Sequence, residues 1–112
     1  MGTLDVWYGD RKLGKICESD RDMRRTYGAL LARKIGQRLA ALRAAESLED
    51  MRPPALGRCH PLTGDYDGCF SLHLDANWRM IFSPVEYEED EQGGLNWSSV
   101  TSVTIEAIED YH

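Results

Sequence analysis

The first pattern along the chain is a short alternation that gives way to a helical period. Residues 3–8, "TLDVWY", alternate, are rich in β-forming side chains and precede a Gly-Asp pair, which predicts a short strand. Apolar positions then recur at helical spacing, which predicts a short helix over 11–17. In "SDRD", Ser19 has the position of an N-cap and Asp22 follows it by three residues. We therefore expect a second helix over 20–28.

The clearest period in the chain belongs to residues 29–48, "ALLARKIGQRLAALRAAESL", which predict the longest helix. One face of that helix is apolar and carries Leu31, Ile35, Leu39 and Leu42. The basic side chains lie off this line, at Arg33, Lys34, Arg38 and Arg43. We interpret them as a solvated helix face, with a surface for phosphates or for an acidic partner as the alternative. Two consecutive prolines in the segment 51–57 end the helix.

The second half of the chain changes to a period of two. Strands are predicted over 58–63, 69–75, 79–85 and 99–109, separated by the turns "GDYDG" and "ANW". Within 69–75 the side chains alternate cleanly, so that Phe70, Leu72 and Leu74 face one way and Ser71, His73 and Asp75 the other. Residues 86–96 are acidic, have no period and predict a solvated loop.

This order of elements predicts an α+β fold. We expect an N-terminal strand, a helical hairpin and then a sheet of three to four antiparallel strands, because consecutive strands joined by short turns pair antiparallel. The helices are expected to cover one face of that sheet. With 112 residues the chain is long enough for one core, so residues 1–112 are expected to form a single domain.

Charge is distributed unevenly along the chain. The net charge is −6, but residues 1–52 contain 11 Lys and Arg against 8 Asp and Glu, whereas residues 53–112 contain 2 against 11. The two basic residues of that second half are Arg58 and Arg79. A nucleic-acid-binding protein normally presents a basic surface, so the first half would have to supply most of it.

The sequence predicts a cytoplasmic protein that does not associate with a membrane. It has no basic start followed by a long apolar region, as a signal peptide has, and no apolar run of the roughly 20 residues that span a bilayer. The three cysteines are odd in number and widely spaced, which favours reduced thiols over a disulfide framework.

Metal and cofactor chemistry receive little support from the sequence. Cys59, His60, Cys69 and His73 are residue types that bind zinc, but the spacing contains no C-x-x-C, and adjacent strand residues point to opposite faces. The turn at 65–68 begins like a calcium loop and lacks the glutamate that such a loop needs at its twelfth position. No phosphate-binding glycine loop is present, so no metal and no cofactor are expected.

The last residues of the sequence combine with one arginine into a possible nuclease site. Asp110 and His112 are two apart, so an extended strand places them on one face with Tyr111 on the other. Histidine titrates near neutral pH and suits proton transfer, while Arg79 can hold a phosphate through two parallel hydrogen bonds. A base for a 2′-hydroxyl, an acid for the leaving oxygen and a cation on the phosphate are the groups that phosphodiester cleavage requires.

The stretch "CHPLTGDYDGCFSLHLDANWRMIF" followed by "IEDYH" resembles the HigB family of bacterial toxins, within the RelE/ParE superfamily. The resemblance implies a ribosome-dependent endoribonuclease that cuts mRNA and is held inactive by a helix-turn-helix, HigA-like antitoxin. It also implies that Arg79 binds the phosphate, that Asp110, Tyr111 and His112 form the catalytic group, and that His60 lies at the edge of the site.

Three departures from the family pattern open a second hypothesis. The lysine of the family's H-P-L-K-G-D turn is Thr63 here, Tyr66 and Asp67 stand where a basic residue often follows, and Asp75 stands where another can occur. Each change removes a cation from the expected path of the RNA. The alternative is a catalytically weak or silent protein that acts mainly by antitoxin binding and operon co-regulation. A gyrase poison of the ParE type is a third hypothesis, and the D-Y-H ending argues against it.

Overall fold

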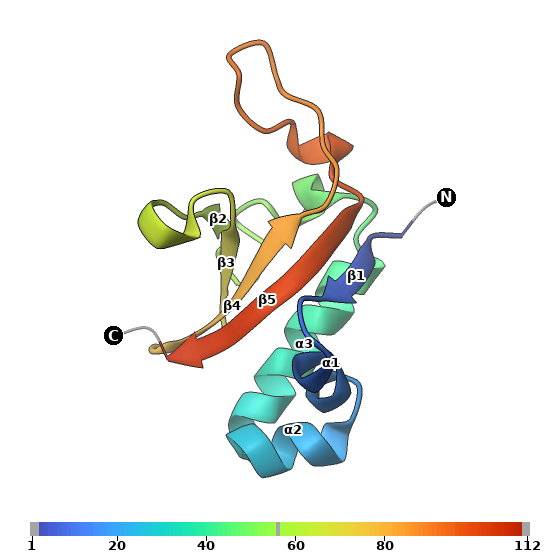
Figure 1. Ribbon diagram of the computed structural model, residues 1–112, viewed down its shortest axis with the longest axis vertical. Coiled ribbons are helices and arrows are strands. Elements are labelled where there is room, and N and C mark those ends of the chain that lie inside the picture. The colour runs from blue at the N-terminus through green and yellow to red at the C-terminus, as the bar shows by residue number, and fades with distance from the viewer. Residues whose placement is uncertain (1–2, 56, 111–112) are drawn as a thin grey trace.

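A computed structural model describes residues 3–55 and 57–110, and its elements match the predicted α+β class (Figure 1). These described residues form three helices, five strands and three short 3-10 turns, named η1 to η3. The helices are α1 (Arg11–Cys17), α2 (Asp20–Tyr27) and α3 (Ala29–Ala44). The strands are β1 (Asp5–Tyr8), β2 (His60–Pro61), β3 (Phe70–His73), β4 (Trp78–Pro84) and β5 (Ser102–Asp110). The 3-10 turns are η1 (Leu48–Met51), η2 (Gly64–Tyr66) and η3 (Trp97–Ser99).

The five strands form one sheet in the order β1-β5-β4-β3-β2. The four strands after the helices are antiparallel to their neighbours, whereas β1 pairs in parallel with β5. The helices between β1 and the rest of the sheet lie together on one face of it (Figure 1). Both the antiparallel arrangement and the coverage of one face by the helices are as predicted.

The core lies between the helices and this covered face of the sheet. The apolar face predicted for α3 is confirmed, because Leu31, Ile35, Leu39 and Leu42 are all buried. From the sheet, the side chains of β3 and β4 that belong to the same cluster are Phe70, Leu72, Met80 and Phe82. Alternation along the strands therefore leaves the intervening side chains on the opposite face, which we call the outer face.

The end of the long helix differs from the prediction. Helix α3 stops at Ala44, because Ala45 is extended, buries its side chain and accepts the Leu4 amide in a 2.7 Å hydrogen bond. The chain thus leaves the helix to join the segment that precedes β1, well before the two prolines. Of residues 45–48, which were predicted as helix, Ser47 is the N-cap of η1 and Leu48 is its first residue.

A second error concerns Arg38, which the periodicity placed on a solvated face. Arg33, Lys34 and Arg43 are exposed, but only 5% of Arg38 is accessible to solvent. Its Nε donates a 2.8 Å hydrogen bond to the His73 carbonyl oxygen. The position lies off the apolar stripe, but its long side chain lies along the core and reaches the end of β3.

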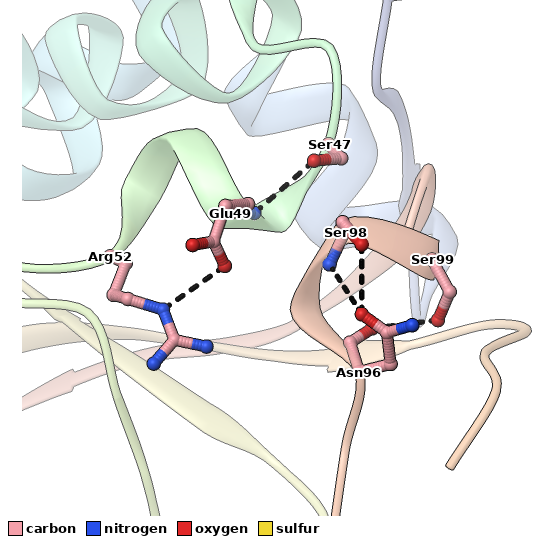
Figure 2. Close-up of polar contacts among 6 residues, drawn as sticks. All are labelled: Ser47, Glu49, Arg52, Asn96, Ser98 and Ser99. Atoms are coloured by element: carbon pink, nitrogen blue, oxygen red, sulfur yellow. Dashed lines mark hydrogen bonds and ion pairs between the residues drawn. The ribbon is translucent and has the colours of Figure 1, made fainter. Parts of the chain in front are cut away.

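The acidic loop between β4 and β5 projects from the body of the protein and is fixed at its base (Figure 1). Figure 2 shows the polar contacts there: the Asn96 side-chain oxygen caps η3 by accepting the Ser98 amide, and the Ser99 hydroxyl donates to the Asn96 carbonyl. Beside them Arg52 bonds Glu49, and its guanidinium stands 4.4 Å from the centre of the Trp97 ring. The start of β5 is therefore tied to η1 despite the solvated loop before it.

Within the described residues, none of the helices combines the length and apolarity needed to cross a bilayer.

Two leucines of α3 provide a matched test of where the core lies. Leu39→Ala removes a side chain that is 2% exposed, and we expect it to lower the free energy of unfolding by about 2–5 kcal/mol. Leu30→Ala removes the same atoms from a position that is 74% exposed, and the expected change is below about 0.5 kcal/mol. Urea denaturation measures both, and equal losses would contradict the assigned face.

Candidate functional site

Four of the side chains that could carry chemistry gather on the outer face of the sheet. Cross-strand pairing sets Ser71 opposite His60, His73 opposite Arg79, and Arg79 opposite Glu109. Because Phe70 and Leu72 point into the core, their neighbours Ser71 and His73 point outward. The outer face therefore brings together His60, His73, Arg79 and Glu109 from four adjacent strands.

His60 is oriented by a hydrogen bond between its ring and the backbone. Its Nδ1 lies 2.8 Å from the carbonyl oxygen of Arg58. A carbonyl only accepts hydrogen bonds, so Nδ1 carries the hydrogen, and Nε2 of the neutral ring presents its lone pair. The same contact fixes the orientation of the ring. His60 was predicted at the edge of the site from a resemblance alone, and its catalytic role stays a prediction.

His73 is a site residue that sequence reasoning did not select. Its ring meets that of His60 edge to face, with 5.6 Å between the centroids. Its backbone is held on both sides, since the amide donates to the Gly57 carbonyl at 2.7 Å and the carbonyl accepts from Arg38. Burial, followed by the charge of Arg79, lowers the pKa of His73 below its ordinary value. The lowered pKa favours the neutral form of the His73 imidazole.

The segment after β2 crosses over the outer face. The Tyr66 hydroxyl, in η2, donates a hydrogen bond to Glu109 on β5, and this bond raises the pKa of Tyr66. Because η2 follows β2, the contact must reach across β3 and β4. Ser71 and Ile81 on this face are fully buried, although the helices lie on the opposite side. The segment thus covers part of the outer face and leaves the histidines partly exposed.

The predicted C-terminal group is only partly described. Asp110 is the last described residue, is exposed, and pairs across the sheet with Trp78, which packs on the helix side against the edge of Tyr27. Its neighbour Glu109 pairs with Arg79. Tyr111 and His112 lie outside the described residues, so the catalytic roles assigned to Asp110, Tyr111 and His112 stay predictions.

The two histidines do not form part of a larger group of metal-ligating side chains. Across residues 3–55 and 57–110, no three His, Cys, Asp or Glu side chains converge as metal ligands. Cys59, next to His60, is buried, and its burial raises the thiol pKa to about 12. Burial likewise raises the pKa of Cys17, to about 11, and that of Cys69. None of the three thiols is activated as a nucleophile.

Comparison with protein families gives one match. The model of a family described as "RelE-like toxin of type II toxin-antitoxin system HigB" matches residues 8–93, which include His60, His73 and Arg79. Among curated proteins, no relative matches the sequence.

Comparison with solved structures gives toxins of one fold. The YoeB/ParE toxin from Agrobacterium tumefaciens aligns with a TM-score of 0.55 at 14% identity, over 97% of this chain and 100% of that one. A YoeB-YefM complex from Staphylococcus aureus gives 0.54 at 12% identity, over 99% of each chain. A YafQ variant from E. coli gives 0.54 at 16% identity, over 96% of this chain and 93% of that one. At these identities the likeness establishes the fold.

The environment of His73 predicts its titration. The NMR midpoint of its imidazole should lie below the ordinary value of about 6.5, and Arg79→Gln should raise it by removing a nearby positive charge. Lys15→Gln, on α1, removes a distant charge and should leave it unchanged. Because the folded state binds this proton more weakly than the unfolded chain, His73 also reduces stability as the pH falls below about 6.5. A His73 midpoint that does not change in the Arg79→Gln variant would contradict the placement of Arg79 beside His73.

Proposed function

The chain belongs to the HigB-like toxin family of type II toxin-antitoxin systems, and from this premise we propose that it is a ribosome-dependent endoribonuclease that cuts mRNA and so inhibits translation. The single observation that supports this chemistry best is the fixed tautomer of His60 on the same face as Arg79. An oriented base and a cation on one face of the sheet are the minimum that cleavage of RNA through its own 2′-hydroxyl requires.

The proposed reaction needs three groups. Nε2 of His60 takes the proton of the 2′-hydroxyl as that oxygen attacks the adjacent phosphorus. Arg79 stabilises the charge on the phosphate oxygens during the attack. The bond from phosphorus to the 5′-oxygen breaks and that oxygen takes a proton, which leaves a 2′,3′-cyclic phosphate and a free 5′-hydroxyl. The C-terminal residues Tyr111 and His112 are proposed to supply that proton. Asp110 pairs with Trp78, which packs on the helix side, so Asp110 does not share the face of Arg79.

In this proposal, binding to the ribosome compensates for the weak RNA affinity that follows from having few basic residues in the second half of the chain. Arg58 and Arg79 are the basic residues of the acidic half, and each missing phosphate contact weakens RNA binding at physiological salt. The exposed basic residues of α3, among them Arg33 and Lys34, are available to bind ribosomal RNA. The ribosome would then deliver the mRNA to the outer face, and free RNA would be a poor substrate.

The proposed partner in the resting state is a helix-turn-helix antitoxin of the HigA type. Two of the solved structures with this fold, both from Staphylococcus aureus, are complexes of YoeB with YefM. An antitoxin that covers the outer face or blocks entry to the ribosome would hold the toxin inactive. The oligomeric state of the pair would then be set mainly by the antitoxin.

A catalytically weak or silent toxin is the second candidate, and the geometry of η2 favours it. Thr63 is exposed and occupies the N-cap position of η2, so the family lysine is missing beside the segment that crosses the outer face. In this case the protein would act through antitoxin binding and operon co-regulation.

Two substitutions test the nuclease proposal on the outer face. Arg79→Ala should lower ribosome-dependent cleavage by about 10²–10³-fold, because a charge on the phosphate is lost. His60→Gln should lower it by about 10²–10⁴-fold, because the base is lost. Arg24→Ala, which breaks an exposed ion pair on α2, is the control and should cleave as the wild type does. Full mRNA cleavage by both site variants would refute the assignment of Arg79 and His60. If the protein causes gyrase-linked DNA breaks instead of mRNA cleavage, it is a gyrase poison.

Restoring the missing cation distinguishes the two candidates. If the absence of lysine limits the reaction, Thr63→Lys should increase mRNA cleavage by about tenfold, the effect of one added charge-assisted contact to the RNA. Thr63→Gln adds length without charge and should not. A wild type that does not cleave and a Thr63→Lys variant that does would identify a silent toxin. No increase in the lysine variant would show that the missing lysine is not the cause.

A further inference from the structure

The basic residues of the acidic half converge on one imidazole. Residues 53–112 contain Arg58 and Arg79 as their two basic side chains. Burial is the largest cause that lowers the pKa of His73, and the charges of Arg79 and Arg58 lower it further. Arg38 reaches the same point from α3 and acts on His73 in the same direction. In a segment with eleven acidic residues, this convergence creates a local positive potential at the end of β3.

A surface pocket lies at this point, beside the pair of histidines. Its walls are formed by Arg38, Gly57, Arg58 and His73, and by the turn after β3, residues 74–76. His73 separates it from Arg79, its partner across the two strands. The pocket is thus adjacent to the proposed reaction site and distinct from it.

Arg38, which lines this pocket, carries an unsatisfied donor. The residue is 5% exposed, and its Nη1 is buried without a hydrogen-bond acceptor among the described residues. None of the ion pairs found within 3–55 and 57–110 includes Arg38. A buried positive charge without a partner is costly, and an anion in the pocket would offset that cost.

The backbone at Gly57 and Arg58, which both line the pocket, has an uncommon conformation. Gly57 and Arg58 have successive positive φ values, 101° and 49°. A Cβ atom on Gly57 would stand 3.0 Å from a methyl group of Leu72 and 3.1 Å from the Nε of Arg38, so glycine is required. A non-glycine residue with positive φ is strained, and such strain concentrates at binding sites.

Asp75 is the one acidic side chain in the pocket wall, and it remains a hydrogen-bonded carboxylate. Its Oδ1 accepts the amides of Asn77 and Trp78, at 2.8 and 2.7 Å, and these bonds lower its pKa. The charge of Lys34 acts on it in the same direction. Because Arg38 and Arg58 outweigh the single charge of Asp75, the pocket walls retain a net positive charge.

We propose that this pocket is a second phosphate subsite, which binds the phosphodiester group of the RNA next to the one held by Arg79. The proposal rests on the proposed nuclease function for the identity of the ligand, whereas the chemistry of the pocket itself requires an oxyanion. Arg58 forms its rim and takes the phosphate oxygens directly. Arg38 supplies buried charge and also positions His73 through the backbone.

The binding test uses the untagged, full-length protein and two probes that it cannot cleave, inorganic phosphate and a short 2′-O-methyl RNA. The NMR signal of the His73 imidazole reports on the pocket. Both probes should shift it, and Arg58→Asn should weaken the RNA affinity by about tenfold. The slope of log affinity against log salt should fall in magnitude by about 0.7, the value for one phosphate contact to a single strand.

Asparagine is chosen because it tolerates the positive φ of residue 58. Arg58→Lys retains the charge and should recover much of the affinity, while Lys15→Gln removes a remote charge and should bind as the wild type does. Circular dichroism establishes that each variant is folded.

The outcomes separate this subsite from the proposed function. If neither probe shifts the His73 signal, the subsite is overturned. An Arg58→Asn variant that binds RNA as well as the wild type would overturn it too. A shift with phosphate but not with RNA would overturn its assignment to the substrate. Arg58-dependent RNA binding without mRNA cleavage would support the subsite and refute the nuclease.

Discussion

The site depends on the way the backbone of His73 is held. The Gly57 carbonyl accepts its amide and Arg38 donates to its carbonyl, so the end of β3 is fixed both by the segment before β2 and by the long helix. Pairing of β3 with β4 places Arg79 on one side of His73, and the His60 ring contacts His73 from the β2 side. A partly buried hydrogen bond from a charged donor is strong enough to fix this relation between helix and sheet. The outer face is therefore organised from within the core.

The interactions around His73 also explain how an acidic chain can present a basic site. The net charge of the second half is unfavourable for RNA, and the acidic loop contributes much of it. That loop projects from the body (Figure 1). Its base is tied to η1 by the contact of Arg52 with the Trp97 ring. Because charges separated by more than a Debye length of about 8 Å are largely screened, the local arrangement of Arg38, Arg58 and Arg79 governs binding more than the total does.

Sequence periodicity predicted the helices, the strands and the covered face, because each depends on which side chains leave water. It did not predict the role of Arg38, since a period states which way a residue points and not how far a long side chain reaches. The end of α3 was misplaced because a tertiary contact to Leu4, and not proline, ends it. The ring contact between His60 and His73 depends on the exact register of β2 against β3, which pairs His60 with Ser71 and which the sequence of a two-residue strand does not reveal. Tyr66 was interpreted only as a lost cation, because its contact with Glu109 spans two strands.

The most direct test of the central claim is the chemistry of the ends of cleaved mRNA in a reconstituted translation system with the untagged protein. Attack by the 2′-hydroxyl with His60 as base predicts fragments that end in 2′,3′-cyclic phosphate and begin with a 5′-hydroxyl, formed only when ribosomes are present. Intact mRNA, or fragments that begin with a 5′-phosphate, would contradict the account.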